Sequence, residues 1–275
     1  MKDHSVSKEL FSVVECTACH LRFTQDAPAE NAISPYYKSE EYISHTNTTK
    51  GLINNLYQLV RKYTLGQKRK LVQQQTGKVT GSLLDLGSGT GAFVNEMKSA
   101  GWQVSGLEPD ADARKVAFES FGVSLSDTSS FFNLQAGSFD AITMWHVLEH
   151  VHDLHGYIAQ LKNLLKPEGR LIIAVPNYTA ADASFYKSSW AAYDVPRHLY
   201  HFSPNSIEVL MKMHGMKVLS FKPMWFDSFY ISMLSSKYRN GYVNLIGAFY
   251  QGLRSNCKAL FNVKKCSSVI YVIGK

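Results

Sequence analysis

The segment Leu83–Gly91, with the sequence LLDLGSGTG, constrains the fold more than any other part of this chain of 275 residues. A short apolar run of strand length leads directly into a turn with three glycines, and a helical pattern follows from Ala92. Glycine in such a turn allows the backbone to approach a ligand closely, and the helix behind it presents free N–H groups and the positive end of its dipole. The segment therefore predicts a strand, a turn and a helix that bind a ligand at the carboxyl end of the strand.

From residue 82 onward, apolar runs of strand length alternate with stretches of helical periodicity. We expect strands at Leu83–Leu86, Gln103–Leu107, Val123–Leu125, Phe139–Trp145, Arg170–Val175, Met216–Phe221 and Ser267–Ile273. We expect helices at Ala92–Ser99, Asp110–Ser120, Leu154–Leu165 and from Ser203 to His214. Strands that alternate with helices form right-handed crossovers and a parallel sheet. The pattern therefore predicts an α/β domain with a doubly wound sheet.

The regions outside this pattern divide the chain further. Residues 1–79 are expected to form an N-terminal arm, irregular over residues 1–50 and helical over residues 51–76, where leucines recur at helical intervals. The ligand-binding domain is expected over residues 80–275. An insertion over residues 227–265 precedes the last strand, and its mixture of aromatic and basic residues is expected to be helical.

The net charge of +7 is concentrated near the end of the chain. Eight Lys and Arg residues lie between Phe221 and Lys275, and Asp227 is the single acidic residue there. Such a basic field attracts anionic partners, and basic and aromatic side chains together are typical of membrane contact or of a site for a lipid-linked acceptor. A homodimer interface through residues 227–265 is the alternative. No nucleic-acid-binding module is recognisable, so we expect no nucleic-acid partner.

The sequence also bears on the compartment and on metal content. No run of about 18 apolar residues predicts a transmembrane helix, and the first residues lack the apolar core of a signal peptide. We therefore expect a cytoplasmic protein with free thiols, and peripheral contact with the inner membrane face through residues 227–265. Cys16 and Cys19 form half of a zinc ribbon, a remnant without its second pair, so we expect no metal there and regard them only as weak candidates.

Two acidic residues accompany the glycine turn. Asp85 ends the first strand, and Glu108 follows the second strand, where a carboxylate can accept hydrogen bonds from both ribose hydroxyls. Gly87, Gly89 and Ala92 also satisfy a relaxed dinucleotide pattern. Asp85 would repel a pyrophosphate but would tolerate a sulfonium nucleoside. S-Adenosylmethionine is therefore the preferred cofactor, an NAD(P)-dependent oxidoreductase is the alternative, and a nucleoside-binding protein without activity is the third interpretation.

Four segments resemble, in order, the successive motifs of class I S-adenosylmethionine-dependent methyltransferases. They are Asp85–Gly91, Glu108, Phe139–Val151 and Leu164–Leu171. The chain is most similar to the ubiquinone-biosynthesis-like group of small-molecule methyltransferases, over about residues 80–220. The resemblance implies a Rossmann-like doubly wound sheet of seven strands, the last one antiparallel, in a methyltransferase domain over residues 80–275. It further implies methyl transfer from S-adenosylmethionine to a quinol-, sugar- or lipid-like acceptor, most simply at oxygen, with S-adenosylhomocysteine as product.

The resemblance also implies which residues bind the cofactor. The glycine turn and Asp85 would hold the methionine part and Glu108 the ribose, with the adenine near Pro109 and the stretch 126–128. Trp145 and His146, at the end of the fourth strand, would border the sulfonium. The full set of implied cofactor-binding residues is Asp85, Gly87, Ser88, Gly89, Gly91, Glu108, Pro109, Asp127, Trp145 and His146.

Candidate catalytic residues follow the fourth strand. An oxygen acceptor requires a general base with a pKa near the working pH, which makes histidine the first candidate. His146 and His150 are four residues apart, so on a helical turn they would share one face, with Glu149 beside them. We expect His150 and His146 to be catalytic. A divalent metal on these three residues, or a purely structural role at a helix start, are the alternatives.

A second cluster lies in the long segment Ser189–His201 after the fifth strand, on the same edge of the sheet. Long loops in compact domains are usually functional, and aromatic residues with Arg and His suit a planar or anionic acceptor. The expected substrate-contacting residues are Glu149, Trp190, Tyr193, Arg197 and His198, and His198 is also a third catalytic candidate. A well-packed loop is the alternative. The tyrosine-rich stretch 36–45 is expected to form a lid over the cofactor or a packed arm.

Overall fold

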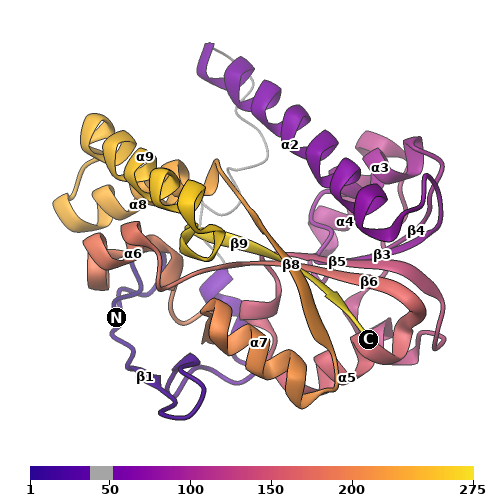
Figure 1. Ribbon diagram of the computed structural model, residues 1–275. Helices are drawn as coiled ribbons and strands as arrows, with labels where there is room; N and C mark the ends of the chain where they lie inside the picture. Colours follow the sequence, from indigo (N-terminus) through magenta and orange to yellow (C-terminus); the bar gives the residue numbers. More distant parts are fainter. Residues whose placement is uncertain (38–51) are drawn as a thin grey trace.

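The computed structural model describes residues 1–37 and 52–275, with side chains from residue 59 in the second range. Its centre is a six-stranded sheet in the order β4-β3-β5-β6-β9-β8 (Figure 1). The strands are β3 (Ser82–Leu86), β4 (Gln103–Leu107), β5 (Phe139–Trp145), β6 (Leu165–Pro176), β8 (Lys217–Pro223) and β9 (Ser268–Gly274). Strands β4, β3, β5 and β6 pair in parallel, whereas β9 pairs antiparallel with both β6 and β8. The expected antiparallel last strand is confirmed.

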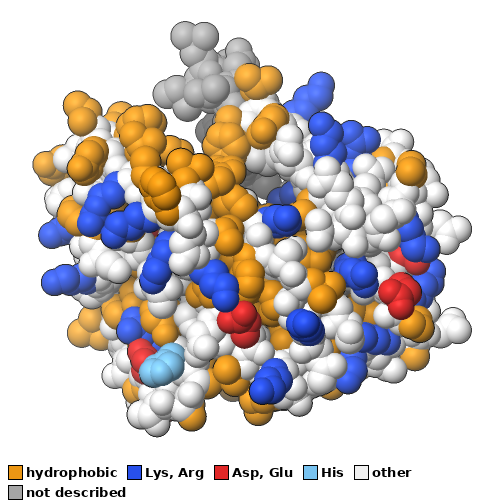
Figure 2. Space-filling view, in the orientation of Figure 1, with side chains coloured by type: hydrophobic (Ala, Val, Ile, Leu, Met, Phe, Trp, Pro, Cys, Tyr) orange, Lys and Arg blue, Asp and Glu red, His pale blue; other side chains and the backbone are white. Residues whose placement is uncertain are grey.

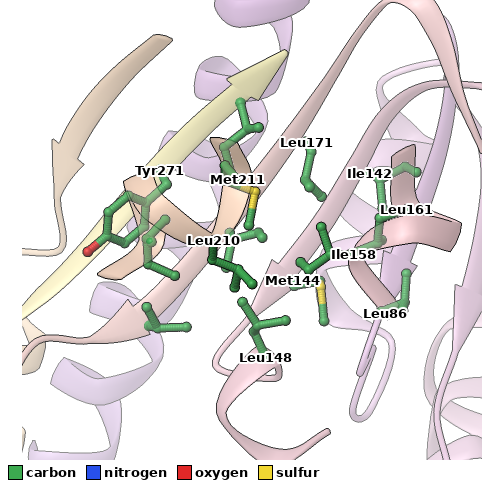
Figure 3. Close-up of a cluster of buried hydrophobic side chains, with 14 of the residues drawn as sticks. Leu86, Ile142, Met144, Leu148, Ile158, Leu161, Leu171, Leu210, Met211 and Tyr271 are labelled. Atoms are coloured by element: carbon green, nitrogen blue, oxygen red, sulfur yellow. The ribbon is translucent and has the colours of Figure 1, made fainter. Parts of the chain in front are cut away.

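Helices cover both faces of this sheet, as expected for a doubly wound fold (Figure 1). They are α2 (Leu52–Thr76), α3 (Ala92–Ser99), α4 (Ala111–Phe121), α5 (Leu154–Leu164) and α7 (Pro204–Met213). In α5 the buried residues recur every three or four positions, so one stripe faces the sheet. Figure 3 shows Ile158 and Leu161 of this helix close to Ile142 and Met144 of β5. On the other face, α2 and α3 bury Val72 and a group around Phe93.

The expected strand Val123–Leu125 does not form, which leaves six strands in the described part of the main sheet. The segment follows Gly122, whose φ is +60°, and Asp127 caps the next turn of helix immediately after it. The residues between Gly122 and Asp127 are too few to form a series of strand hydrogen bonds with β4. Only Ser126 bridges to Leu107, with hydrogen bonds of 2.9 Å that link it to the backbone of Gly106 and Glu108.

The prediction of irregular structure is wrong for residues 13–24. Strands β1 (Val13–Glu15) and β2 (Arg22–Thr24) form a hairpin, and β2 pairs antiparallel with β7 (Tyr200–His201). This small sheet depends on a partner nearly 180 residues away in the chain, so no local pattern reports it. Cys16 and Cys19 lie in the hairpin turn and are free thiols. Of the expected lid, Tyr36 and Tyr37 are described in a short 3₁₀ helix, η1 (Ser34–Tyr37), and residues 38–45 lie outside the described residues.

The insertion before β9 is helical, as predicted. Helices α8 (Asp227–Asn240) and α9 (Leu245–Phe261) pack against each other and against α6 (Ala181–Tyr186). The two long helices approach closely at Gly252 of α9, where a Cβ would come within 2.7 Å of Phe229 of α8. None of the described helices combines the length and the apolar character needed to cross a bilayer.

Short 3₁₀ helices complete the connections. They are η2 (Thr128–Asn133), η3 (Leu148–His150), η4 (Lys187–Ser189), η5 (Ala191–Tyr193) and η6 (Val263–Lys265). Residues 166–169, between the expected helix and the expected strand, form a bulge within β6, where the register with β5 shifts from Phe139–Leu165 to Ala141–Arg170. Because η3 follows β5 directly, it begins at the same edge of the sheet as the glycine turn.

Candidate active site

The glycine turn connects β3 to α3 at the carboxyl ends of the parallel strands. Gly87, Gly89 and Gly91 all have positive φ, of +68°, +52° and +76°, which favours glycine at each position. A Cβ on Gly87 would lie 2.4 Å from Val147, and one on Gly91 would lie 2.8 Å from Ala117. A Cβ on Gly89 would meet no described atom within 4 Å. The outer glycines therefore allow close packing, and the middle one leaves the open side of the turn to a ligand.

Asp85 lies below this turn and is 1% exposed. Thr143, its partner in the parallel register of β5, donates a hydrogen bond of 2.6 Å from Oγ1 to its carboxylate, and the Ser88 hydroxyl donates to its backbone carbonyl. Burial raises the pKa of Asp85 to about 7, although the Thr143 hydrogen bond and the ammonium of Lys68 oppose that rise. The side chain is thus a buried carboxyl group that loses its proton more readily when a cation approaches.

Glu108 joins the second strand to the glycine turn. Its Oε2 accepts a hydrogen bond of 2.7 Å from the Gly89 amide, and its Oε1 accepts one of 3.1 Å from the Asp110 amide. Burial also raises the pKa of this carboxyl above its ordinary value. Asp85 and Glu108 therefore flank the turn from two strands, an acidic arrangement that suits the cationic groups and ribose hydroxyls of a sulfonium nucleoside and disfavours a pyrophosphate.

One arginine holds the expected adenine-binding residues together. Arg114 Nη1 donates to the carbonyls of Glu108 and Pro109, at 2.6 and 2.8 Å, and forms an ion pair of 2.9 Å with Asp127. Asp127 also caps η2 by accepting from the Ser129 amide. The structure thus brings Glu108, Pro109 and Asp127 together around Arg114, and their contact with the adenine stays a prediction.

Trp145 and His146 end β5 on the opposite rim. The Trp145 ring packs edge-on against Phe93, and the ammonium of Lys68, from α2, lies 4.2 Å from its centroid. His146 has a φ of +59°, and its imidazole bridges two carboxylates: Nε2 is 2.9 Å from Asp227 Oδ2 and Nδ1 is 3.4 Å from Glu149 Oε1.

This bridge decides the charge of His146. Burial alone would lower its pKa, but the carboxylates of Asp227 and Glu149 raise it to about 10. The ring is therefore an imidazolium at neutral pH. An imidazolium cannot accept a proton, so the geometry favours an electrostatic role for His146, and it ties the start of α8 to the end of β5.

The expectation that His146 and His150 share one face does not hold, because His146 precedes η3 and turns toward α8. The structure instead brings His198, from the second cluster, next to Glu149 and His150. One ligand atom from each of these three side chains lies within 4.8 Å of the others, and the two imidazole rings meet edge to face at 4.7 Å. Burial, assisted by the nearby His198, lowers the pKa of His150 to about 4, so its imidazole is neutral.

The remaining expected substrate residues make contacts within the protein. Trp190 and Tyr193 are buried, and their polar atoms bond to Asp182 and Arg22, at 2.8 and 2.9 Å. The guanidinium of Arg197 forms ion pairs with Asp194 and Asp3 at 2.7 and 3.1 Å. These contacts favour a role in holding the loop and the N-terminal arm together. Direct contact of Trp190, Tyr193 and Arg197 with an acceptor stays a prediction.

Two residues near the site, Lys68 and Asp227, were not given a site role from the sequence, and a third, Tyr37, belongs to the stretch 36–45 that was expected to form a lid or a packed arm. Lys68 faces Asp85 and Trp145 from α2, Asp227 binds His146 from α8, and Tyr37 lies 3.0 Å from His150 through its hydroxyl. The sequence contains one indication that Asp227 is special, because it is the single acidic residue in the basic segment from Phe221 to Lys275. Cys16 and Cys19 gain no third metal-ligating neighbour among residues 1–37 and 52–275.

Comparisons with known proteins agree with this geometry. A family model described as a methyltransferase domain matches residues 57–220. A ubiquinone biosynthesis O-methyltransferase from Xanthomonas axonopodis pv. citri is 36% identical over 107 residues, 36% of this chain and 44% of the relative. The mitochondrial enzyme of that name from Rattus norvegicus is 28% identical over 163 residues, 54% of this chain and 47% of the relative. The chain thus spans about half the length of the curated relatives it matches.

A solved structure shares the fold at low sequence identity. Phosphoethanolamine N-methyltransferase 2 of Haemonchus contortus, in complex with S-adenosyl-L-methionine, superimposes with a TM-score of 0.51 at 18% identity, over 76% of this chain and 52% of that one. The acidic glycine turn, the doubly wound sheet and the family match over residues 57–220 lead to one conclusion. The chain belongs to the class I S-adenosylmethionine-dependent methyltransferases, with S-adenosylmethionine as its cofactor.

Proposed function

We propose that this protein methylates a hydroxyl oxygen of a small-molecule acceptor. The observation that carries the proposal is the cluster of Glu149, His150 and His198, which lies at the same sheet edge as the cofactor residues. Histidine and carboxylate side chains, among them the neutral ring of His150, suit an acceptor that must lose a proton. The names of the curated relatives, which are O-methyltransferases, support the same atom.

The roles of the chain's own residues follow from their positions. S-Adenosylmethionine, when bound, supplies a methyl group on a positively charged sulfur. Asp85 and Glu108 bind its cationic and ribose groups, and the enzyme then needs to align an acceptor with the methyl. His198 Nδ1 donates to the Ala192 carbonyl at 2.8 Å. In the neutral form of the ring this contact leaves Nε2 as a hydrogen-bond acceptor for the hydroxyl, and the neutral ring of His150 lies beside it.

An acceptor panel tests the proposal. The protein is incubated with methyl-labelled S-adenosylmethionine and with quinols, sugars, lipid-linked phenols, amines and thiols, and products are assigned by mass spectrometry and NMR. We expect labelled methoxy products from one hydroxyl class. Exclusive transfer to nitrogen, sulfur or carbon would overturn the assignment of the acceptor atom.

The pKa of Asp85 predicts how cofactor affinity depends on pH. Because burial raises this pKa to about 7, the carboxyl is protonated and uncharged below pH 7 and ionised above it. The ionised form attracts the cationic cofactor, so affinity for S-adenosylmethionine should fall about tenfold between pH 8 and pH 6, since each factor of ten is about 1.4 kcal/mol. Calorimetry on Asp85→Asn should give a much flatter profile. A wild-type profile as flat as that of the variant would contradict this role.

We further propose that the α8–α9 hairpin rests on an anionic membrane surface and presents the site to a lipid-linked acceptor. Large apolar side chains are exposed along its outer side, with Ile246 86% and Phe261 93% exposed. Phe229, Met233 and Phe249 border a shallow apolar hollow between the two helices. Figure 2 shows hydrophobic side chains gathered over this region with Lys and Arg beneath them. Apolar groups flanked by cations fit a bilayer surface with acidic headgroups.

Vesicle flotation tests this surface. The wild type should float with phosphatidylglycerol-containing vesicles and much less with pure phosphatidylcholine. The double variant Ile246→Glu/Phe261→Glu should lose at least tenfold in partitioning, because insertion of each side chain contributes about 1.5–3 kcal/mol. Phe118→Glu is the matched control, since Phe118 is equally large and 63% exposed but lies on α4. Equal flotation of all three proteins, or a dimer in sedimentation that the double variant abolishes, would overturn the membrane assignment.

A further inference from the structure

We infer that Arg197 and Tyr37 are positioning residues for the acceptor side of the site. The buried guanidinium of Arg197 fastens residues 1–37 of the N-terminal arm to the loop of residues 194–199, and the arm thereby holds the Tyr37 hydroxyl against His150. The inference rests on the proposed function, because that function places the acceptor hydroxyl beside the histidine cluster. It goes further, because it makes the arm, which precedes the region matched by the family model, a part of the acceptor site.

The guanidinium of Arg197 is the first argument. The residue is 2% exposed, and all three of its nitrogens donate hydrogen bonds. Nε and Nη2 donate to the two carboxylate oxygens of Asp194, at 2.9 and 2.7 Å, which is a bidentate pair within the loop. Nη2 also donates to Asp3 at 3.1 Å, and Nη1 donates to the carbonyl of Tyr36 at 2.8 Å, so the same group binds the arm at two separate places. A planar guanidinium makes these contacts together, whereas an ammonium cannot make the bidentate one.

The turn around Asp3 receives this cation. The carboxylate is fully buried and accepts hydrogen bonds of 2.8 to 3.1 Å from the backbone amides of Ser5, Val6 and Ser7. Burial alone would raise the pKa of Asp3, but the hydrogen bonds from Ser7, Arg197 and Val6 hold it well below its usual range. The carboxylate is therefore charged at neutral pH, and its ion pair with the guanidinium joins the first residues of the chain to the loop.

The position of Tyr37 is the second argument. The residue directly follows Tyr36 in η1, and its hydroxyl oxygen lies 3.0 Å from Nδ1 of His150. The same nitrogen lies 3.0 Å from the backbone carbonyl of Arg197. A carbonyl can only accept, so in the neutral ring Nδ1 carries the proton and Nε2 keeps its lone pair. Both the arm and the arginine that fastens it thus contact the nitrogen that sets the orientation of this ring.

The arm also holds the backbone next to His198. Thr24 of β2 donates from Oγ1 to the carbonyl of His198 at 2.7 Å and from its amide to the carbonyl of Leu199 at 2.9 Å. The amide of Leu199 in turn donates to the carbonyl of Glu149 at 2.7 Å. Hydrogen bonds therefore run from the arm through the loop to η3, and they connect the segments that carry the cluster.

Tyr37→Phe and Arg197→Lys test the two contacts separately. The first removes one hydroxyl, and the second keeps the positive charge near Asp3 but loses the bidentate contact with Asp194. In the full chain at pH 8, with the acceptor found in the panel, each variant should lose about 10- to 100-fold in kcat, because a displacement of about 1 Å spoils the alignment of the ring. The affinity for S-adenosylhomocysteine should stay within about threefold of the wild type, because the contacts given for both side chains lie on the arm, the loop and His150.

The ionisation of His150 gives a readout that a general loss of stability would not change. Burial, assisted by His198, lowers the pKa of this ring to about 4, against the carboxylates of Glu149 and Asp194, which raise it. Loosening of the arm in Arg197→Lys admits water to the ring, so its pKa should rise toward the ordinary value of about 6.5. NMR titration of protein labelled with ¹⁵N in histidine measures this pKa, and the spectrum of His150→Ala assigns the signal. At pH 8 the ring is neutral at either value, so kcat at that pH reports its orientation.

Two control variants match these exchanges. Tyr36→Phe removes the hydroxyl of the neighbouring residue in η1, which donates to the exposed Glu9 at 2.8 Å. Arg22→Lys makes the same exchange at another arginine between the arm and the loop region, which contacts Glu15 and Tyr193 at 2.8 and 2.9 Å. Both controls should keep the kcat of the wild type, and thermal unfolding without ligand checks that all four variants fold.

A wild-type kcat in Tyr37→Phe would overturn the inference, and so would a pKa of His150 that stays near 4 in a folded Arg197→Lys. Equal losses of kcat in the control variants would also overturn it, because any weakening of the arm would then have the same effect. If Arg197→Lys does not fold, Tyr37→Phe decides alone.

The outcome is separable from that of the proposed function. O-Methylation at the wild-type kcat in both variants removes the positioning roles and leaves the assignment of the acceptor atom intact. Exclusive transfer to nitrogen, sulfur or carbon removes the proposed acceptor atom. A loss of kcat with that acceptor in Tyr37→Phe, together with the raised pKa of His150 in Arg197→Lys, then leaves the positioning roles intact.

Discussion

The Glu108→Ala variant should bind S-adenosylhomocysteine about 100-fold more weakly than the wild type, a loss of about 2.7 kcal/mol. We expect the ribose to donate two hydrogen bonds to this buried carboxylate, and each hydrogen bond to a charged group contributes about 1.5–3 kcal/mol. It also accepts from the Gly89 amide at 2.7 Å, so its loss loosens the glycine turn as well. Isothermal titration calorimetry at pH 8, where Asp85 is ionised, measures the change.

Controls separate this effect from a general loss of stability. Glu119→Ala removes an exposed carboxylate of the neighbouring helix α4, whose contact is a 3.9 Å pair with Lys115, and should leave affinity unchanged. Thermal unfolding without ligand should show Glu108→Ala folded. A Glu108→Ala protein that binds within threefold of the wild type would show that the ribose lies elsewhere.

The His150→Ala variant should lose at least 100-fold in kcat, whereas its affinity for S-adenosylhomocysteine should stay within threefold of the wild type. The neutral ring of His150 lies in the cluster with Glu149 and His198, and its described hydrogen bonds go to Tyr37 and the Arg197 carbonyl rather than to Asp85 or Glu108. Removal of a group that positions or deprotonates the acceptor typically costs a factor of 10² to 10⁴. Steady-state kinetics with the acceptor found in the panel, combined with calorimetry, gives both numbers.

His152→Ala is the matched control for this prediction. It removes a histidine two residues away whose ring bonds to the Pro28 carbonyl at 3.1 Å, outside the cluster. It should retain most of the wild-type kcat. A wild-type kcat in His150→Ala would show that the residue takes no part in the reaction. Equal losses of kcat in both variants would indicate damage to the η3 segment as a whole.

Side chains from α2, α8 and the N-terminal arm also surround the site. Lys68 enters from α2 and lies between Trp145 and Asp85, and Asp227 enters from the first turn of α8 to hold His146 as an imidazolium. Tyr37 enters from the N-terminal arm. Three separate elements therefore each contribute one side chain to the surroundings of β5 and the η3 segment.

Local patterns determined most of the fold and the cofactor site. The bounds of α3 and β4 agree with those expected, because apolar periodicity and glycine stops act over a few residues. Asp85, the glycine turn and Glu108 meet at one sheet edge because parallel strands place their carboxyl ends together. Trp145 lies at the same edge, because it is the last residue of β5 and β5 pairs in parallel with β3.

Tertiary structure alone decided how Glu149, His150 and His198 come together and how the N-terminal arm folds. His146 and His150 look equivalent in sequence, yet the positive φ of His146 and its pairing with Asp227 separate them, and His198 takes the third place beside Glu149. The hairpin of β1 and β2 exists because it pairs with β7, and Val123–Leu125 fails as a strand because caps on both sides leave no room for a ladder. Contacts between residues far apart in the chain depend on the assembled fold, and no local periodicity encodes them.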